Sequence, residues 1–200
     1  MKSRVPWWIW WLAASAAVVS LIPALSRWAI YDRNAVLNGE LWRLVTAPLV
    51  HFTPGHLAYD TFALILAGAL IQWRGYRSLG WVCGLTALAS GLVVLLLEPQ
   101  LAFYGGLSGV ATAAVVFLAF HGTREQGAWR WVCAAALVAA VGKILFEFNF
   151  GSFAFLSVDP ELFRPVPLCH TTGALVGVTV FFSQQWQAKQ GGNAVSLVIN

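Results

Sequence analysis

The sequence predicts an all-α membrane protein, a bundle of six transmembrane helices whose short fourth helix is placed centrally. Three observations support this class: 59% of the 200 residues are hydrophobic, only 10% are charged, and the mean hydropathy is +0.72. A soluble domain carries about 25% charged residues. A soluble core of this size could not use so much apolar surface, so most of the chain is expected in the bilayer.

Six apolar stretches approach the length of about 20 residues that a spanning helix needs. They cover approximately 6–26, 54–73, 79–97, 107–121, 129–147 and 167–186. The first follows Lys2 and Arg4 and is longer than the apolar core of a signal peptide, so we interpret it as a signal anchor. We expect one membrane domain over 1–189 and a flexible tail over 190–200.

Basic residues predict that the N-terminus is cytoplasmic. With that orientation the inner side holds Lys2, Arg4, Arg74, Arg77, Arg124, Arg130 and Lys189. The longest loops, 27–53 and 148–166, then lie outside. The outer segments together carry most of the acidic residues: Asp32, Glu40, Glu98, Asp159 and Glu161. The positive-inside rule favours this arrangement. The net charge of +4 is modest, and we expect no nucleic-acid partner.

Polar residues recur in the first turns of three helices that would all run inward from the outer side. His56 and Asp60 open the second helix, Ser108 opens the fourth and His170 opens the sixth. His56 and Asp60 are four residues apart and share a helix face. Polar groups inside a membrane are costly and are functional candidates by default. Their common depth therefore predicts a functional site.

The chemistry of these groups predicts acyl transfer. Ser108 could serve as a nucleophile and His170 as its base. Ser108 also opens a helix, where free backbone N–H groups favour an oxyanion. Gly105, Gly106 and Gly109 would leave room for a substrate carbonyl. From helix length, Ser108 lies roughly 10 Å below the outer surface, in a pocket that is open to water.

Four stretches in order resemble the rhomboid intramembrane serine proteases over essentially the whole chain. "GLSG" (106–109) resembles their GxSG, and "HTTGALVG" (170–177) resembles HxxGxxxG. "ELWRLVT" (40–46) is similar to ExWRxxT in the first outer loop, and "HLAYD" (56–60) is similar to HxxxN. GxSG alone is a weak signal, whereas the four stretches together are a specific one.

The resemblance implies a catalytic dyad with Ser108 as the nucleophile and His170 as the base. It implies an oxyanion site formed by His56, the side chain of Asp60 and the Ser108 backbone N–H. Gly173 and Gly177 would let the sixth helix approach the fourth closely. No metal and no cofactor are expected, since zinc sites use tighter spacings such as HExxH.

A finer resemblance concerns the rhombosortase branch. "GK" at 142–143, followed by Glu147, and the acid in "HLAYD" look like that branch. It implies a single-span substrate with a C-terminal Gly-Gly tail, a membrane helix and a basic end. Compact size and the absence of organelle signals lead us to expect a bacterial inner membrane, with the site opening to the periplasmic side.

The chain departs from the family pattern at two positions. Asp60 stands where most rhomboids have Asn, and an ionised carboxylate would repel an oxyanion. Either burial keeps Asp60 protonated, or Asp60 pairs with His56 and holds that ring cationic; we prefer the pair. Thr112 replaces an aromatic residue that supports the histidine, and Tyr104 or Phe103 are weakly supported substitutes.

Structural interpretations compete with these assignments. Ser108 could be a helix cap, and His56 and His170 could be structural. We expect His51 and His121 at the membrane interface, Lys143 and Glu147 as an i,i+4 pair, and a phenylalanine-rich lid or interface segment at 148–166. Cys83, Cys133 and Cys169 are interpreted as packing residues. An inactive rhomboid-like binder of membrane helices and a small transporter remain as alternative functions.

Overall fold

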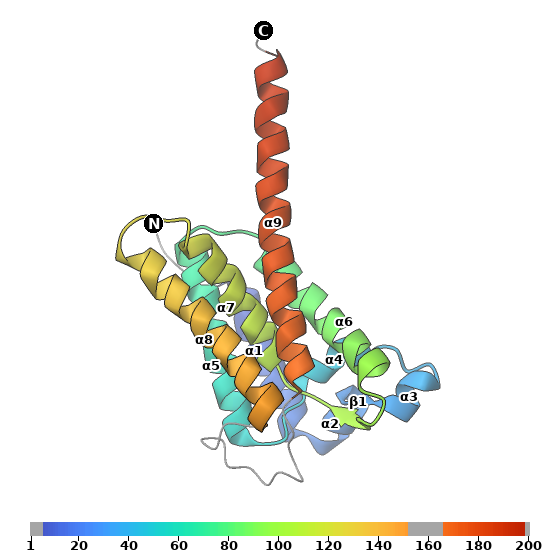
Figure 1. The fold of residues 1–200 in the computed structure, drawn as a ribbon. Helices are drawn as coiled ribbons and strands as arrows, with labels where there is room; N and C mark the ends of the chain where they lie inside the picture. Colours follow the sequence, from blue (N-terminus) through green and yellow to red (C-terminus); the bar gives the residue numbers. More distant parts are fainter. Residues whose placement is uncertain (1–5, 152–165, 199–200) are drawn as a thin grey trace.

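A computed structural model describes residues 6–151 and 166–198 and consists almost entirely of helices (Figure 1). The long elements are α1 (Trp7–Leu21), α5 (Pro54–Trp73), α6 (Leu79–Leu97), α7 (Ser108–Gly122), α8 (Ala128–Phe150) and α9 (Pro167–Val198). The short ones are α2 (Pro23–Ala29), β1 (Tyr31–Asp32), α3 (Arg33–Leu37), α4 (Arg43–Thr46), the 3₁₀ turn η1 (Ala47–Leu49) and β2 (Phe103–Tyr104).

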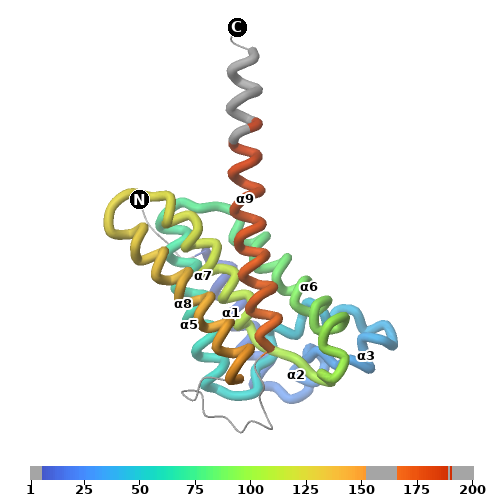
Figure 2. Tube along the Cα trace, viewed as in Figure 1, coloured from blue at the N-terminus to red at the C-terminus, as the bar shows by residue number. Residues whose placement is uncertain are grey.

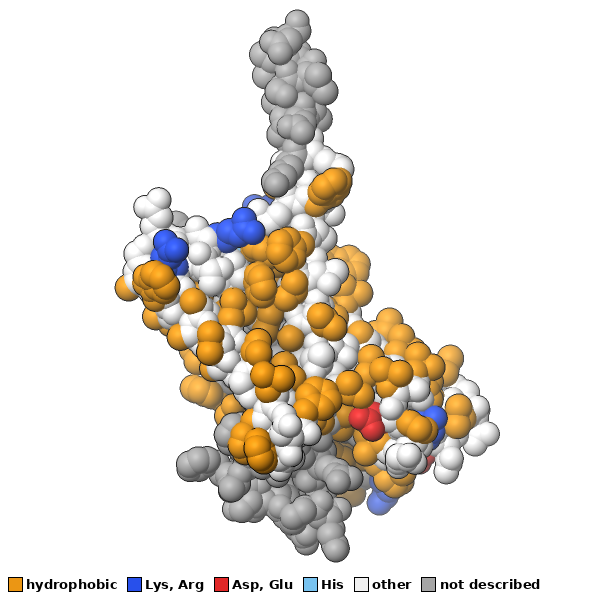
Figure 3. Space-filling view, viewed as in Figure 1, with side chains coloured by type: hydrophobic (Ala, Val, Ile, Leu, Met, Phe, Trp, Pro, Cys, Tyr) orange, Lys and Arg blue, Asp and Glu red, His pale blue; other side chains and the backbone are white. Residues whose placement is uncertain are grey.

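Three helices in the described residues are long and apolar enough to cross a membrane: α5, α6 and α8. The pair α1 and α2 qualifies together but is bent by 109°. Helix α7 is apolar but has only 15 residues. Figure 3 shows apolar side chains spread over the visible face of the bundle. The chain is therefore a helical integral membrane protein with three to four candidate spans by length and composition.

The continuous first helix predicted over 6–26 is wrong, because the chain breaks at Ile22. Pro23 is the first residue of α2, and it cannot donate a backbone hydrogen bond to the preceding turn. A proline also disfavours helical backbone in the residue before it, and Ile22 is extended with φ −103° and ψ 107°. The chain turns there into the segment that leads to β1.

Helix α9 is longer than the predicted stretch 167–186. It continues through most of the segment that we expected to be a flexible tail (190–200), up to Val198. No proline follows Pro167 in the sequence, so nothing there removes a helical hydrogen bond. In Figures 1 and 2 the trace of α9 runs past the ends of the other helices.

Helix α7 packs against four other long helices, α5, α6, α8 and α9. Its contact with α9 is a backbone contact. A Cβ added at Gly173 would collide with the Gly109 carbonyl oxygen, and one added at Gly177 would lie 2.6 Å from the Ala113 oxygen. Small residues allow such an approach between membrane helices. Short α7 and its glycine-mediated contact with α9 thus determine where the two N-terminal ends meet.

The segment before α7 is held by the long first loop. Strands β1 and β2 pair antiparallel, with Tyr31 opposite Tyr104. Arg43 stabilises this loop from inside: its Nη1 donates to the carbonyls of Arg27 and Ile30, both at 2.8 Å, and its Nε lies 2.7 Å from Glu40 Oε2. Arg43 is buried despite its charge, and these contacts satisfy it. The loop therefore fixes the approach to Ser108.

Candidate active site

The predicted site residues come from three helix N-termini that share one end of the bundle (Figure 1). Ser108 is the first residue of α7, and His170 lies in the first turn of α9. His56 and Asp60 lie in the first two turns of α5, which Thr53 caps by accepting from the His56 backbone N–H at 3.1 Å. Helices α5, α7 and α9 run in the same direction, so these turns lie at a similar level.

Ser108 lines a cavity of about 260 Å³ between α5, α7 and α8. Asp60 and Lys143 line the same cavity, and most of the remaining lining consists of alanines: Ala63, Ala111, Ala136, Ala139 and Ala140. Thr112 also lines it and donates its hydroxyl to the Ser108 carbonyl at 2.8 Å. The cavity is therefore mostly apolar, with a few polar groups near the serine.

His170 is buried, and its two ring nitrogens have different surroundings. Nδ1 lies 2.5 Å from Glu147 Oε2 and 3.1 Å from Lys143 Nζ, while Lys143 Nζ donates to Glu147 Oε1 at 2.6 Å. The predicted Lys143–Glu147 pair is thus confirmed, and it extends to the histidine. Nε2 is buried and has no hydrogen-bond partner in the described part of the chain. In those residues no hydrogen bond joins it to the Ser108 hydroxyl.

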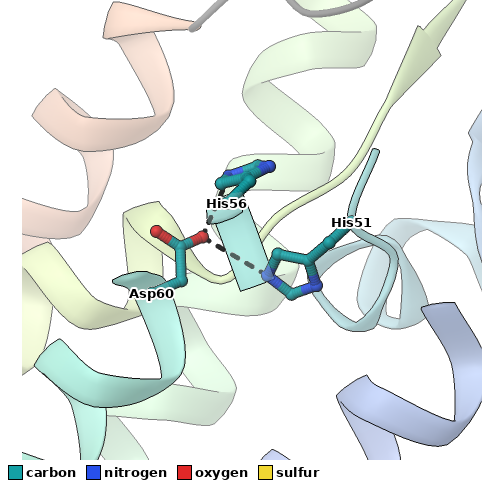
Figure 4. Close-up of side chains that lie close together, drawn as sticks. All are labelled: His51, His56 and Asp60. Carbon is teal, nitrogen blue, oxygen red and sulfur yellow. Dashed lines mark ion pairs between the residues drawn. The ribbon is translucent and has the colours of Figure 1, made fainter. Parts of the chain in front are cut away.

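Asp60 contacts two histidines, His51 and His56 (Figure 4). Its Oδ2 is 3.0 Å from His56 Nε2 and 3.4 Å from His51 Nε2, and all three side chains are almost fully buried. The interfacial position predicted for His51 is therefore wrong. His51 lies in a loop five positions before His56, where no helical periodicity relates the two residues. The sequence therefore did not indicate that His51 contacts Asp60.

His51 connects the first helix to the segment before Ser108. The Leu107 backbone N–H donates to His51 Nε2 at 3.2 Å, and Ser20 Oγ lies 3.3 Å from His51 Nδ1. Ser20 Oγ itself donates to the Leu49 carbonyl and so is free to accept from Nδ1–H. This network assigns the His51 proton to Nδ1. His51 Nε2 then has no proton to donate to Asp60, whereas His56 Nε2 can carry one.

The glycines of the stretch 105–109 allow close packing around these side chains. A Cβ at Gly106 would lie 2.7 Å from His56 Cε1, and the residue has φ +124°, which side chains rarely adopt. A Cβ at Gly105 would lie 2.7 Å from the Val50 carbonyl, and one at Gly109 would lie 3.0 Å from the Cys169 carbonyl. Close packing within the protein is thus a reason why glycine occupies these positions. The predicted room for a substrate carbonyl is a separate reason, which stays a prediction.

Neither aromatic residue considered as a support for His170 has a ring contact with it in the described chain. Phe103 is exposed, and Tyr104 is buried edge-on against Tyr31. Glu147 and Lys143 contact the ring instead. Most of the phenylalanine-rich segment 148–166 lies outside the described residues, and Phe148 and Phe150 are exposed.

His51, His56 and Asp60 could in principle hold a metal ion, since one ligand atom from each lies within 4.8 Å of the others. Two imidazoles and a carboxylate are a donor set that zinc accepts. The observed distances also suit a contact between charged groups, so the expected absence of a metal stays a prediction. Cys83, Cys133 and Cys169 are buried free thiols, as packing residues would be.

The fold and the site define a class of protein: a helical membrane protein that carries a serine and a histidine on the touching N-termini of two helices. The rhomboid domain matches residues 38–185, and the chain belongs to the rhomboid family. The matched range includes every candidate site residue.

Two curated relatives are similar to this chain. An uncharacterized protein of Mycobacterium leprae is 26% identical over 136 residues, which cover 64% of this chain and 54% of the relative. A rhomboid protease GlpG homolog of Cronobacter sakazakii is 31% identical over 106 residues, which cover 52% of this chain and 37% of the relative. The chain thus matches about half the length of one relative and less of the other.

Proposed function

We propose that this chain is an intramembrane serine endopeptidase with Ser108 as the nucleophile and His170 as the base. The observation that carries the proposal is the close contact of α7 and α9 at Gly109 and Gly173. It packs the turn that holds Ser108 against the turn that holds His170, a buried histidine with an unpartnered Nε2 among the described residues. Membership of the rhomboid family, which includes proteases, adds to it.

The proposed reaction begins when the Ser108 hydroxyl passes its proton to His170 Nε2 while Oγ bonds to the substrate carbonyl carbon. The resulting oxyanion would be stabilised by the Ser108 backbone N–H and by His56. Nε2 then returns the proton to the leaving amine as the C–N bond breaks, and water hydrolyses the ester on Ser108 by the same route. Catalytic hydrogen bonds are often long in a resting enzyme and tighten with substrate.

The position of Asp60 supports the version in which it pairs with His56. Asp60 Oδ2 lies 3.0 Å from His56 Nε2. The proton of His51 is assigned to its Nδ1, which is not the ring nitrogen that faces Asp60. A carboxylate beside His56 stabilises a cationic imidazole, which would serve an oxyanion better than a neutral one. In this proposal Asp60, which also lines the cavity beside Ser108, acts on the oxyanion through His56.

The proposed substrate is a single-span membrane protein with a C-terminal Gly-Gly tail, as in rhombosortases. Glycine disfavours helix by about 1 kcal/mol, so such a tail unwinds readily for cleavage. The alanine-lined cavity beside Ser108 suits a strand with small side chains. We further propose six membrane crossings, a cytoplasmic N-terminus and a periplasmic site in a bacterial inner membrane, which agree with the distribution of arginines in the sequence.

A second candidate is an inactive rhomboid-like protein that binds membrane helices as a chaperone. It is favoured by one observation: among the described residues no hydrogen bond joins Ser108 to His170.

Fluorophosphonate labelling of membranes distinguishes the two candidates without knowledge of a substrate. An activated serine in the wild type should label, and Ser108→Ala and His170→Ala should both abolish labelling. Ser90→Ala is a matched control, because Ser90 is buried near Gly109 but is not the proposed nucleophile. If the wild type labels no better than Ser108→Ala while a known serine protease labels well, the helix-binding candidate replaces the peptidase.

A further inference from the structure

Glu147 is a buried carboxylate on α8, a helix with few buried side chains. Among the described residues of α8, only Cys133 and Glu147 are buried. Burying a carboxylate is costly unless it is paired and hydrogen-bonded. Lys143, one turn earlier, supplies the opposite charge at 2.6 Å, but that pair could equally form at the surface. A reason for its burial must therefore come from its other neighbour, His170.

The geometry at His170 determines which ring nitrogen carries the proton. Glu147 Oε2 is the closer neighbour of Nδ1 at 2.5 Å, and Lys143 Nζ lies at 3.1 Å. An ionised carboxylate can only accept, so a contact this short requires a proton on Nδ1. Lysine can only donate, so the longer Lys143–Nδ1 approach is not a hydrogen bond in this arrangement, and the ammonium donates to Glu147 instead. Lys143 saturates the other carboxylate oxygen and keeps Glu147 ionised. The neutral ring then presents its lone pair at Nε2, which is buried and unpartnered.

We infer that Glu147 is a positioning residue for the histidine base, so that Ser108, His170 and Glu147 act as a triad in which Lys143 keeps the carboxylate charged. The inference rests on the proposed peptidase function. Glu147 accepts the Nδ1–H hydrogen bond before and after proton transfer and does not itself take the proton. When Nε2 receives the Ser108 proton, the adjacent carboxylate stabilises the imidazolium. This contact replaces the aromatic support that Thr112 cannot give.

The substitution Glu147→Gln gives a sharp test because an amide has one acceptor and one donor end. Lys143 can only donate, so it should take the amide oxygen and leave the amide NH₂ facing His170 Nδ1. That arrangement moves the histidine proton to Nε2, where it blocks base function. We expect fluorophosphonate labelling of Ser108 to fall by roughly 10²-fold or more.

The double variant Lys143→Met/Glu147→Gln should reverse the effect. Without the lysine, the amide oxygen is free to accept from Nδ1–H, and labelling should recover by at least about tenfold over Glu147→Gln. A packing role predicts the opposite order, because the double change removes more contacts. Glu125→Gln is a control for the loss of an ion pair elsewhere, since Glu125 pairs with Arg74 at 2.7 Å far from the site. Thermal unfolding in detergent shows that each variant is folded.

Nitrogen NMR of histidine-labelled protein gives a readout that needs no activity. The chain has only four histidines, so the His170 signals can be assigned by their loss in His170→Gln. We expect an Nδ1–H ring in the wild type, an Nε2–H ring in Glu147→Gln and Nδ1–H again in the double variant. Wild-type labelling with an unchanged tautomer in Glu147→Gln would overturn the inference alone. The tautomer exchange without any wild-type labelling would instead overturn the peptidase and leave the role of Glu147 intact.

Discussion

Asp60 Oδ2 lies 3.0 Å from His56 Nε2, one turn away on the same helix, and both side chains are almost fully buried. A carboxylate at this position would oppose an oxyanion if it faced one directly. In contact with His56, the same carboxylate can instead hold the imidazole ring in place. The relationship therefore makes substitutions at Asp60 informative about the electrostatics of the proposed site.

Asp60→Asn should retain labelling of Ser108 within about tenfold of the wild type, whereas Asp60→Ala should lose roughly 10²-fold, comparable with the loss of one oxyanion donor. Asparagine keeps an oxygen near His56 Nε2, but alanine leaves that buried ring unsupported. The measurement is the rate of fluorophosphonate labelling for both variants. Equal and complete inactivity of the two would mean that the charge itself is essential.

His51→Leu should lower the free energy of unfolding by about 1–3 kcal/mol, because the buried Leu107 N–H loses its acceptor. Labelling should fall as well, since that N–H belongs to the segment that leads into Ser108. Thermal unfolding and labelling would be measured together. His121→Leu is the matched control: His121 lies at the other end of α7, stacked on Tyr76, and its loss should leave labelling intact.

Much of the helical framework could be predicted because the length of an apolar stretch can be read directly from the local sequence. The predicted stretches 54–73 and 79–97 coincide with α5 and α6, and 107–121 differs from α7 by one residue at each end. The break at Ile22 was missed, although Pro23 supplied a local signal for it. The continuation of α9 was missed because a polar composition lowers hydropathy without preventing a helix.

The surroundings of the site were harder to predict, since they depend on contacts between distant segments. His51 sits in a loop, and its burial follows from the packing of α1, η1 and the segment before α7. From the sequence, Glu147 is interpreted as a partner of Lys143 and as part of the finer family resemblance, but not as a neighbour of His170. A topological argument could have found its contact with His170: α8 and α9 are consecutive long helices, so the last turns of α8 and the first turn of α9 are expected at the same end of the bundle.

Gly173→Ala should destabilise the protein by about 1–3 kcal/mol, the usual cost of overpacking, because the new methyl group collides with the Gly109 carbonyl. The collision separates α7 from α9, so labelling should fall together with the midpoint of thermal unfolding. Gly142→Ala in α8 is the control, since a Cβ there meets nothing within 4 Å and alanine favours helix by up to about 1 kcal/mol. Equal unfolding midpoints for the two variants would contradict close α7–α9 packing.

Arg43→Lys should weaken the site although Arg43 touches none of its residues. The guanidinium contacts Glu40 and reaches the carbonyls of Arg27 and Ile30 at once, which the single ammonium of lysine cannot do. The Arg27 carbonyl belongs to α2 and the Ile30 carbonyl immediately precedes β1. Strand β1 pairs with β2, and β2 leads into the glycines before Ser108. Loosening this connection should lower the unfolding midpoint and reduce labelling by a few fold.

Glu40→Gln separates the two contributions of Arg43. The ion pair loses its charge, but both carbonyl contacts of the guanidinium remain, and Glu40 is partly exposed, so the pair contributes on the order of 1 kcal/mol at most. We therefore expect Glu40→Gln to label close to the wild-type rate while Arg43→Lys does not. If the two variants lose labelling equally, the charge pair rather than the carbonyl contacts holds the loop, and the route from Arg43 through β1 and β2 to Ser108 would have to be abandoned.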